Sequence, residues 1–278
     1  MLNILKYNGQ DNGLLKLGFC NISFLKRVRN MSKVTFDFTD ERYVVTGATS
    51  GMGRQVALEL AAAGAKVLAI GRNADRLQDI KESFPDNIFP AQLDVCDSAA
   101  LEEAIKVFVA EHGKLNGSVH AAGIYEITPI KNYDVDIAKN IMEISFWAGM
   151  KLLQLVTKVK YGMNGTSTVL FSSVSAFSHE KGMFAYSATK AAMNSGILAA
   201  SKEICGKKHR VNSVVPGWVK TPMTENASEV DSTNSIFERT LLGVGSPEDV
   251  TGMVLFLLSS RASWVTGSTV VVDGGYLA

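Results

Sequence analysis

The sequence predicts an α/β fold, in which helices cover both faces of a doubly wound parallel sheet of about seven strands. The first observation is that short apolar runs rich in β-branched residues alternate with amphipathic stretches from Arg42 to the end of the chain. The second is that no linker divides this pattern. The third is size, because 278 residues, of which 46% are hydrophobic, can bury one large core. We therefore expect a single domain.

Each expected strand is a short apolar run bounded by turn residues. In chain order the runs are RYVVTG from residue 42, KVLAIGR from 66, NIFPAQLDV from 87, GSVHAAG from 117, STVLFSSV from 167, RVNSVVPG from 210 and STVVVDGG from 268. Helical patterns fill the gaps between them. The stretch after the first strand, GRQVALELAAAGA, repeats apolar residues at helical spacing, and we expect this helix to end at Gly64.

Two segments fall outside this alternation. Residues 1–31 are basic and match nothing that follows, and a natural beginning lies at Met31, so we expect an N-terminal extension that is a mis-assigned start or a mobile tail. A basic organelle-targeting leader is the alternative. Residues 32–278 then form the domain. Within it, residues 221–246 turn polar and irregular, which predicts a lid over a pocket.

Composition excludes several classes of function. The net charge is +1 and no long stripe of Lys and Arg occurs, so nucleic acid is not an expected partner. The three cysteines, Cys20, Cys96 and Cys205, show no CxxC or Cys/His spacing, which predicts neither a disulfide framework nor a metal site and favours a reducing cytoplasm. No apolar run is long enough for a transmembrane helix, so we expect no membrane partner.

Glycines mark the turn between the first strand and the first helix. In VVTGATSGMGRQ, Gly47, Gly51 and Gly53 let the backbone approach a ligand closely, and the helix N-terminus offers free N–H groups to a pyrophosphate. The spacing departs from the G-x-G-x-x-G fingerprint. A nucleoside-triphosphate loop is excluded, because Arg54 and Gln55 stand where that loop requires Lys and Ser or Thr. The turn therefore predicts a dinucleotide cofactor.

The end of the second strand indicates which dinucleotide binds. Where NAD binders usually carry an acidic residue for the ribose 2′-hydroxyl, this chain has Gly71 followed by Arg72. A guanidinium can pair bidentately with a 2′-phosphate, which favours NADP(H) over NAD(H). Arg72 as an ordinary solvated loop residue is the alternative. Asp94, which ends the third strand, is expected either to contact an adenine amino group or only to cap the next helix.

A tyrosine and a lysine share one face of the helix expected from FAYSATKAAMNSG. Tyr186 and Lys190 are four residues apart and therefore neighbours. If the ammonium stays charged, it lowers the pKa of the Tyr186 phenol and makes it a usable proton donor. In the alternative, the tyrosine caps the helix and the lysine points to water.

Taken together, these motifs resemble the compact short-chain dehydrogenase/reductases, a Rossmann-type family, and in particular the 3-oxoacyl-acyl-carrier-protein reductases and the carbonyl and sugar reductases. The resemblance covers about residues 38–278. It is carried by the glycine turn, by AAG at 121–123, by Ser173 before the tyrosine, by Tyr186-x-x-x-Lys190, by NSVVPGWVKTPM from 212 and by VDGG from 272.

The resemblance implies a role for each of these residues. Tyr186 would be the general acid or base, Lys190 would lower its pKa and bind the nicotinamide ribose, and Ser173 would hydrogen-bond the carbonyl oxygen. Ser173 as a turn or cap serine is the alternative. The implied cofactor contacts are Gly47, Thr49, Ser50, Gly51, Met52, Gly53, Arg72, Asp94, Val95, Ala121, Ala122, Gly123, Tyr186, Lys190, Pro216, Gly217, Val219 and Thr221.

Two positions depart from the family pattern. Ser145, with Ala148 after it, stands where the family usually has Asn and Gly, and the asparagine holds a water chain to the lysine. We include Ser145 among the catalytic candidates, with a weaker or rebuilt proton relay. His120 and Ala121 replace two asparagines that brace the sheet. We expect His120 to be a packed strand histidine rather than a catalytic one.

The expected activity is NADPH-dependent reduction of a carbonyl, working reversibly as an alcohol dehydrogenase. The alternatives are an NAD-dependent sugar or polyol dehydrogenase and a catalytically weak dinucleotide-binding sensor or scaffold, which only Ser145 favours. A small-molecule carbonyl or alcohol is the expected substrate, and a 3-oxoacyl thioester on an acidic carrier protein, met by Lys207 and Lys208, is one possibility. The apolar pocket candidates are Trp147, Phe177, Met183, Phe184, Trp218 and Met223.

The resemblance also implies a homotetramer or dimer. Its interface would be built from the helices that begin near Asp134 and Phe184, because the small-residue face of YSATKAAMNSGILAAS suits close helix approach. Packing within one chain would use this face equally well.

Overall fold

The computed structural model of the 278-residue chain describes residues 34–225 and 239–278. The expected N-terminal extension 1–31 and the central part of the expected lid 221–246 lie outside the described residues. By its contacts the chain divides into two units, residues 1–35 and residues 36–278. Everything below concerns the described part of the second unit.

The described strands form one parallel sheet of seven, as the sequence predicts. They are β1 (Arg42–Thr46), β2 (Lys66–Gly71), β3 (Ile88–Gln92), β4 (Leu115–His120), β5 (Gly162–Phe171), β6 (Arg210–Pro216) and β7 (Thr269–Val272). Their order across the sheet is β3-β2-β1-β4-β5-β6-β7, and all neighbours are parallel. The order reverses between β1 and β4, and the carboxyl ends there form the crevice in which such sheets bind ligands.

The boundaries differ from the expected ones mainly at β4 and β5. Both strands begin earlier than their apolar runs, because Leu115 already pairs with Gly162, and the register then shifts so that Gly117 pairs with Ser167. The extra residues on β5 include the exposed segment from Met163 to Gly165, which forms no continuous apolar run, so hydrophobic patterning gives no signal for it.

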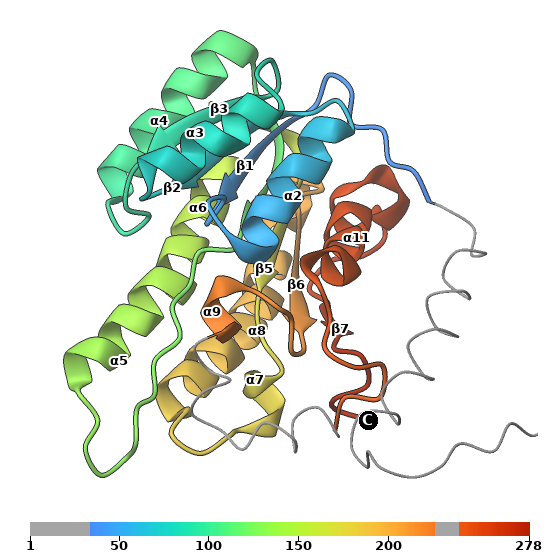
Figure 1. Cartoon of the computed structure of the whole chain (residues 1–278). Helices are drawn as coiled ribbons and strands as arrows, with labels where there is room; N and C mark the ends of the chain where they lie inside the picture. The colour runs from blue at the N-terminus through green and yellow to red at the C-terminus, as the bar shows by residue number, and fades with distance from the viewer. Residues whose placement is uncertain (1–33, 226–238) are drawn as a thin grey trace, which may run out of the picture. The chain divides into compact units, whose positions relative to one another are not determined.

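Helices cover both faces of the sheet (Figure 1). The helices of four or more residues are α2 (Gly51–Ala62), α3 (Ala74–Ser83), α4 (Ser98–His112), α5 (Val135–Met142), the π-helix η1 (Glu143–Trp147), α6 (Ala148–Thr157), α7 (Ser175–Ser178), α8 (Phe184–Ile204), α9 (Pro222–Glu225) and α11 (Pro247–Leu258). Two short 3₁₀ turns, η2 (Cys205–Lys207) and η4 (Ser260–Ala262), follow α8 and α11. No helix in residues 34–225 and 239–278 is long and apolar enough to cross a bilayer.

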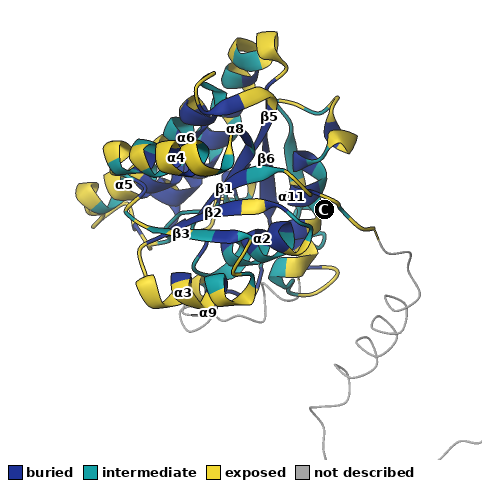
Figure 2. Cartoon of the chain, turned by 90° about the horizontal axis from the view of Figure 1, so that it is seen from above, coloured by how far each residue is buried: buried dark blue, intermediate teal, exposed yellow. Residues whose placement is uncertain are grey.

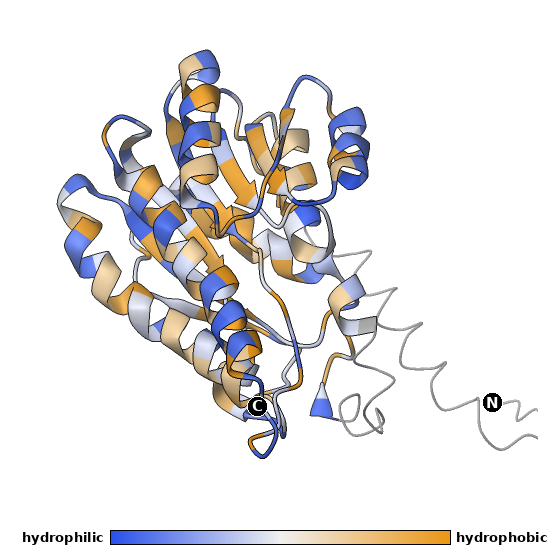
Figure 3. Cartoon of the chain, turned by 90° about the vertical axis from the view of Figure 1, so that its left-hand side faces the viewer, coloured by the Kyte–Doolittle hydropathy of each residue, from blue (hydrophilic) through white to orange (hydrophobic). Residues whose placement is uncertain are grey.

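The core has two layers, one on each side of the sheet. Along β1, Val45 faces the layer beneath α2, α3 and α11, whereas Val44 faces the layer beneath α4 and α6. A cluster under α8 extends the second layer. Viewed from above, buried strands run between helices whose outer surfaces are exposed, and the strands are the most hydrophobic segments (Figures 2 and 3). Burial on both faces explains why the strands read as continuous apolar runs.

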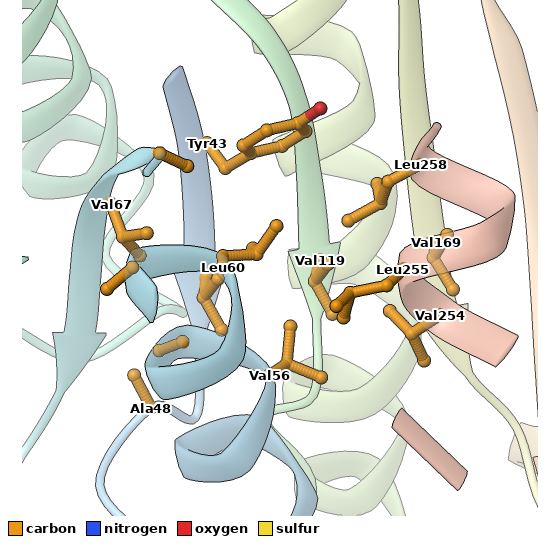
Figure 4. Packing of buried hydrophobic residues seen from close by; sticks show 14 of the residues in the cluster. Tyr43, Ala48, Val56, Leu60, Val67, Val119, Val169, Val254, Leu255 and Leu258 are labelled. Atoms are coloured by element: carbon orange, nitrogen blue, oxygen red, sulfur yellow. The ribbon is translucent and has the colours of Figure 1, made fainter. Parts of the chain in front are cut away.

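Helix α2 shows how the sequence sets an element of the site. Val56 and Leu60 point from it towards Val119 of β4, and Val254 and Leu255 of α11 meet them there (Figure 4). The helix ends before Gly64, whose φ of 92° lies in the left-handed region, as expected. This packing fixes the N-terminus of α2 at the carboxyl edge of the sheet.

Candidate active site

A cleft of about 210 Å³ lies at the carboxyl ends of the strands. The residues that line it come from the turn after β1, the ends of β2 and β3, the AAG segment after β4, helix α8 and the Thr221 segment. Of the expected cofactor contacts, it brings together Gly47, Thr49, Ser50, Gly51, Met52, Gly53, Arg72, Asp94, Val95, Ala121, Ala122, Gly123, Tyr186, Lys190 and Thr221. Segments spread over the whole domain therefore meet in one crevice.

Backbone atoms of Gly47, Ala121 and Ala122 form the floor of this cleft. A Cβ on Gly47 would lie 2.7 Å from the carbonyl carbon of Ala121 and from the amide nitrogen of Ala122, and the φ of Gly47 is 69°. A Cβ on Gly53 would overlap the Gly47 carbonyl oxygen. Only glycine fits these positions, so the close approach is set by the sequence.

The N-terminus of α2 opens onto the cleft, which is lined there by Ser50, Gly51, Met52 and Gly53. Its N-cap residue, Ser50, makes no side-chain capping bond, and the first turn carries no acidic residue. Thr221 lies over this end, where its Cγ2 would be 3.1 Å from a Cβ on Gly51. Free N–H groups and the positive end of a helix dipole suit a phosphate group.

Gly71 and Arg72 shape the neighbouring wall. A Cβ on Gly71 would overlap Cγ2 of Thr49, so a larger residue at this position would require the Thr49 side chain to move. Arg72 is exposed and lines the cleft, its carbonyl accepts a hydrogen bond of 3.1 Å from Gln92, and its guanidinium makes no ion pair within the described residues. A guanidinium at the cleft without an acidic partner can bind an anion.

Asp94 does not cap the following helix, which was one of its two expected roles. Asp97 is the N-cap of α4 and accepts hydrogen bonds from the amides of Ala99 and Ala100. The Asp94 carboxylate instead accepts from the Cys96 amide at 2.9 Å and lines the cleft. The carboxylate is therefore held at the site by a local turn.

Lys190 is buried on α8, so the alternative in which it points to water is wrong. Its Nζ donates a hydrogen bond of 2.7 Å to the carbonyl oxygen of Phe171, at the end of β5. Nζ lies 5.4 Å from the centroid of the Tyr186 ring. Burial lowers the pKa of Lys190 to about 8. The ammonium form persists at neutral pH beside the phenol.

The pKa of Tyr186 moves in the direction opposite to the one expected. Burial raises it to about 12, the hydrogen bond with Ser173 opposes that rise, and the neighbouring Tyr125 adds to it. The proximity of Lys190 predicts a lowered pKa, but desolvation of the buried phenol is the larger effect. Tyr186 is therefore neutral at physiological pH and carries the proton that it can donate.

A second cavity of about 90 Å³ adjoins the cleft. Both are lined by Met52, Tyr186, Thr221 and Met223, so the phenol stands where they meet. The second cavity also contains Ser173 and three other expected contacts, namely Pro216, Gly217 and Val219, and two of the apolar candidates, Trp218 and Met223. The cavity thus lies beside the Tyr186 side chain and can hold a small molecule.

The other apolar pocket candidates do not line either cavity. Trp147, Phe177 and Phe184 are exposed, and Met183 is buried in a cluster with Tyr186. The sequence alone does not indicate whether these four side chains point into a cavity or away from it.

Ser173 lies two residues after β5 and takes the turn role that the sequence left open. Its Oγ accepts a hydrogen bond of 3.1 Å from the Ser175 amide, which forms a turn at the start of α7. The same hydroxyl interacts with Tyr186 and lines the second cavity. The turn therefore orients a hydroxyl towards the phenol.

Comparisons with known proteins identify the family. The family model described as enoyl-(acyl carrier protein) reductase matches residues 47–277. An L-xylulose reductase of Caenorhabditis elegans is 35% identical over 251 residues, which cover 87% of this chain and 97% of the relative. A 3-oxoacyl-[acyl-carrier-protein] reductase of Thermotoga maritima is 31% identical over 238 residues, which cover 84% of this chain and 96% of the relative.

The chain belongs to the short-chain dehydrogenase/reductase family. A solved member from Brucella melitensis, described as a glucose/ribitol dehydrogenase, has a TM-score of 0.82 and 28% identity, and the match covers 87% of this chain and 99% of that one. The predicted family is confirmed, and with it an oxidoreductase that uses a nicotinamide dinucleotide. The glycine floor, the free N-terminus of α2 and the open wall beside Arg72 fit such a cofactor.

Ser145, which the sequence analysis places at the position of a family asparagine, lies in a π-turn. It is fully buried in η1, and its hydroxyl has no hydrogen-bond partner among the described residues. A Cβ on Gly123 would lie 3.2 Å from the Ser145 Oγ and 3.7 Å from the Lys190 Nζ. The hydroxyl and the ammonium thus both lie close to Gly123, although Ser145 lines neither cavity.

His120 is buried on β4 and packed within the sheet, as the sequence predicts. Its Nε2 lies 3.0 Å from the carbonyl oxygen of Ile144, which can only accept, so Nε2 donates and Nδ1 accepts from the Thr46 hydroxyl at 2.8 Å. Burial lowers the pKa of His120 to about 4, which keeps this neutral form. The ring ties β1 and β4 to the π-turn that carries Ser145.

Sequence reasoning missed Tyr125, Glu180 and Tyr276, which line the second cavity. The Tyr125 ring meets the Tyr186 ring edge-on at 5.7 Å. Tyr125 and Tyr276 follow the carboxyl ends of β4 and β7, and that position was the available signal. Glu180 lies in an irregular segment between α7 and α8, where no pattern indicates its direction.

Proposed function

We propose that this chain is an NADPH-dependent carbonyl reductase that works reversibly as an alcohol dehydrogenase. One observation carries the proposal: the Tyr186 phenol stands at the junction of the glycine-lined cleft and the second cavity, in contact with Ser173 and beside Lys190. A proton donor is then next to both a cofactor space and a substrate space.

The chemistry follows from the states of these side chains. A bound nicotinamide dinucleotide supplies the hydride. Neutral Tyr186 donates its proton to the substrate oxygen, and Ser173 hydrogen-bonds the same oxygen as negative charge develops on it. The ammonium of Lys190, positioned by the Phe171 carbonyl, stabilises the phenolate that remains. In the reverse direction the phenolate accepts the alcohol proton.

Ser145 is proposed as a positioning residue for the return of this proton. Its buried hydroxyl lacks a partner in the described residues, and both it and the Lys190 ammonium lie close to Gly123, so a water molecule there could hydrogen-bond to both groups. A serine is shorter than the family's asparagine, and the π-turn brings its backbone to this position. The relay is thus rebuilt rather than lost.

The preference for NADPH rests on Gly71 and Arg72. Position 71 carries no acidic side chain, and the guanidinium of Arg72 is available for a 2′-phosphate. Arg72→Ala should weaken NADPH binding at least about tenfold and leave NADH binding nearly unchanged. Fluorescence titration measures both dissociation constants, and Arg261→Ala, in the exposed η4 turn, is the control. Equal weakening for the two cofactors would overturn the preference.

We also propose a homo-oligomer, either a tetramer or a dimer, in a reducing cytoplasm. Helices α5 and α8 begin where the interface helices were expected, and they expose Val135, Phe184 and Leu198. Cys96 and Cys205 are free thiols, which suits that compartment.

A panel of ketones, ketoses, 3-oxoacyl thioesters and secondary alcohols, assayed with NADPH and NADH in parallel, tests the activity. Turnover of at least one carbonyl, faster with NADPH, is the expected result. If the protein binds NADPH but turns over no compound with either cofactor, the activity is refuted and a sensor or scaffold is favoured.

A further inference from the structure

The π-turn η1 deprives one backbone carbonyl of its usual helical donor. In an α-helix the carbonyl of Ile144 would accept from the amide of Ala148, four residues further on. In this chain the Ala148 amide donates instead to the carbonyl of Glu143, five residues back. Single π-turns of this kind are frequent at functional sites. The Ile144 carbonyl is therefore open to a donor from outside its own helix.

His120 is the side chain that meets this carbonyl. Its Nε2 lies 3.0 Å from the Ile144 oxygen, and the carbonyl of Ser145 also interacts with the ring. The Thr46 hydroxyl donates to Nδ1 at 2.8 Å, which leaves the ring hydrogen on Nε2, where a carbonyl can accept it. The imidazole is thus held between the last residue of β1 and the turn that carries Ser145.

Packing fixes the ring as firmly as its hydrogen bonds do. His120 is 1% exposed, and a Cβ on Gly149, the second residue of α6, would lie 2.8 Å from its Cδ2. Burial and the charge of Lys190 lower the pKa of His120 to about 4, so the ring stays neutral near pH 7. A histidine in this state takes up no proton during turnover, and it lines neither cavity. Its remaining task is to hold the turn.

The turn in question places the Ser145 hydroxyl near the lysine. A Cβ on Gly123 would lie 3.2 Å from the Ser145 Oγ and 3.7 Å from the Lys190 Nζ. The hydroxyl is fully buried and has no hydrogen-bond partner among the described residues, so no other side chain there anchors it. Its position depends on the backbone of η1, and a shift of about 1 Å would weaken a contact made through water, because hydrogen bonds have a narrow range of lengths.

We propose that His120 is a positioning residue of the reaction. Its Nε2–H holds the carbonyl of Ile144 and thereby keeps the Ser145 hydroxyl in place for the proton relay at Lys190. This assignment rests on the carbonyl reductase activity and on the role of Ser145 proposed above.

Two substitutions of nearly equal size separate the hydrogen bond from the packing. His120→Gln and His120→Met both remove the ring nitrogen that accepts from Thr46, but only the glutamine amide can donate to the Ile144 carbonyl. His120→Gln should keep kcat within about threefold of wild type, and His120→Met should lower it about tenfold or more. The dissociation constant for NADPH, measured by fluorescence titration, should be unchanged in both. Equal kcat in the two variants would overturn the proposal.

A double-mutant cycle tests whether His120 acts through Ser145. Ser145→Ala should lower kcat about as much as His120→Met does. Adding His120→Met to Ser145→Ala should then cost no more than about a further twofold, because the hydroxyl that it positions is already absent. A loss of the same size in both backgrounds would mean that His120 only supports the sheet.

Gly149→Ala carries the same comparison if His120→Met does not fold, which urea unfolding shows. The added Cβ displaces the ring and leaves its two hydrogen-bonding nitrogens intact. Here too kcat should fall about tenfold when Ser145 is present and no further than about twofold in Ser145→Ala, and equal losses would refute the positioning role. Gly252→Ala is the control, because no heavy atom lies within 4 Å of its added Cβ, and it should leave kcat unchanged.

Hydrogen exchange follows the turn without turnover. Mass spectrometry of peptides that cover residues 143–149 should show faster exchange in His120→Met than in His120→Gln, whereas peptides from residues 184–204 should exchange alike. This pattern in a protein that turns over no carbonyl compound refutes the reductase and leaves His120 as the residue that holds the turn. Equal exchange and equal kcat in the two variants of an active reductase refute the positioning role and leave the reductase intact.

Discussion

The two adjoining cavities are built in opposite ways. The floor of the cleft is backbone, and a single added methyl group at Gly47 or Gly53 would collide with backbone atoms. The second cavity is walled by side chains such as Trp218, Glu180 and Tyr276, which project from separate segments. A surface made of backbone can change only if the fold changes, whereas a surface made of side chains can change one residue at a time. The cleft therefore suits a constant ligand and the second cavity a variable one.

The largest effect on the cleft is expected when one methyl group is added at Gly53. Gly53→Ala drives a Cβ into the Gly47 carbonyl oxygen, so we expect NADPH affinity to fall at least about 100-fold or the protein to lose stability by several kcal/mol. Fluorescence titration and urea unfolding measure these effects.

Gly252→Ala is the matched control, because Gly252 is also helical and has no heavy atom within 4 Å of an added Cβ. It should stabilise the protein by about 0.5–1 kcal/mol and leave NADPH binding unchanged. Similar behaviour of the two variants would mean that the cleft is not limited by backbone contact.

The next largest effect is expected at the junction of the cavities. Tyr186→Phe removes the proton donor and keeps the ring, so kcat for carbonyl reduction should fall by about 10²–10⁴ while the dissociation constant for NADPH stays the same. Tyr133→Phe is the control: it removes a hydroxyl from an exposed ring that lines neither cavity, and it should change neither kcat nor the dissociation constant for NADPH. Turnover retained in Tyr186→Phe would leave the proposed chemistry without its acid.

The pH dependence of kcat/KM distinguishes the titration of Lys190 from that of Tyr186. Because burial lowers the pKa of Lys190 to about 8 and raises that of Tyr186 to about 12, the ammonium is lost first as the pH rises. We expect kcat/KM for reduction to be level below about pH 8 and then to fall by up to tenfold per pH unit. Lys190→Arg should move the falling limb to higher pH, and a limb that stays in place would assign it to another group.

The smallest effect is expected at Ser145. Ser145→Asn restores the family residue next to Lys190, so reductase activity should be unchanged or higher, by no more than about threefold. Steady-state kinetics at saturating cofactor measures this. A loss of tenfold or more would show that the correspondence of Ser145 with the family's asparagine is wrong.

The sequence predicted the cleft better than the second cavity, for a physical reason. Glycines and strand ends leave a local pattern, so Gly47, Gly53 and Arg72 could be assigned to one crevice from their positions alone. The wall residues Glu180 and Tyr276 are 96 positions apart and meet only through the tertiary fold. The raised pKa of Tyr186 could not be predicted either, because it results from burial, which depends on how the whole chain packs.

Position 120 has a consequence for how this protein can vary. The His120 ring joins Thr46 to the π-turn and fills the space beside Gly149, where an added Cβ would lie 2.8 Å from its Cδ2. A smaller residue at 120 would open that space and at the same time release the carbonyl of Ile144. Sequence changes at 46, 120 and 149 should therefore be inherited together, so that covariation among these three sites distinguishes this branch of the family from members with an asparagine at the sheet centre.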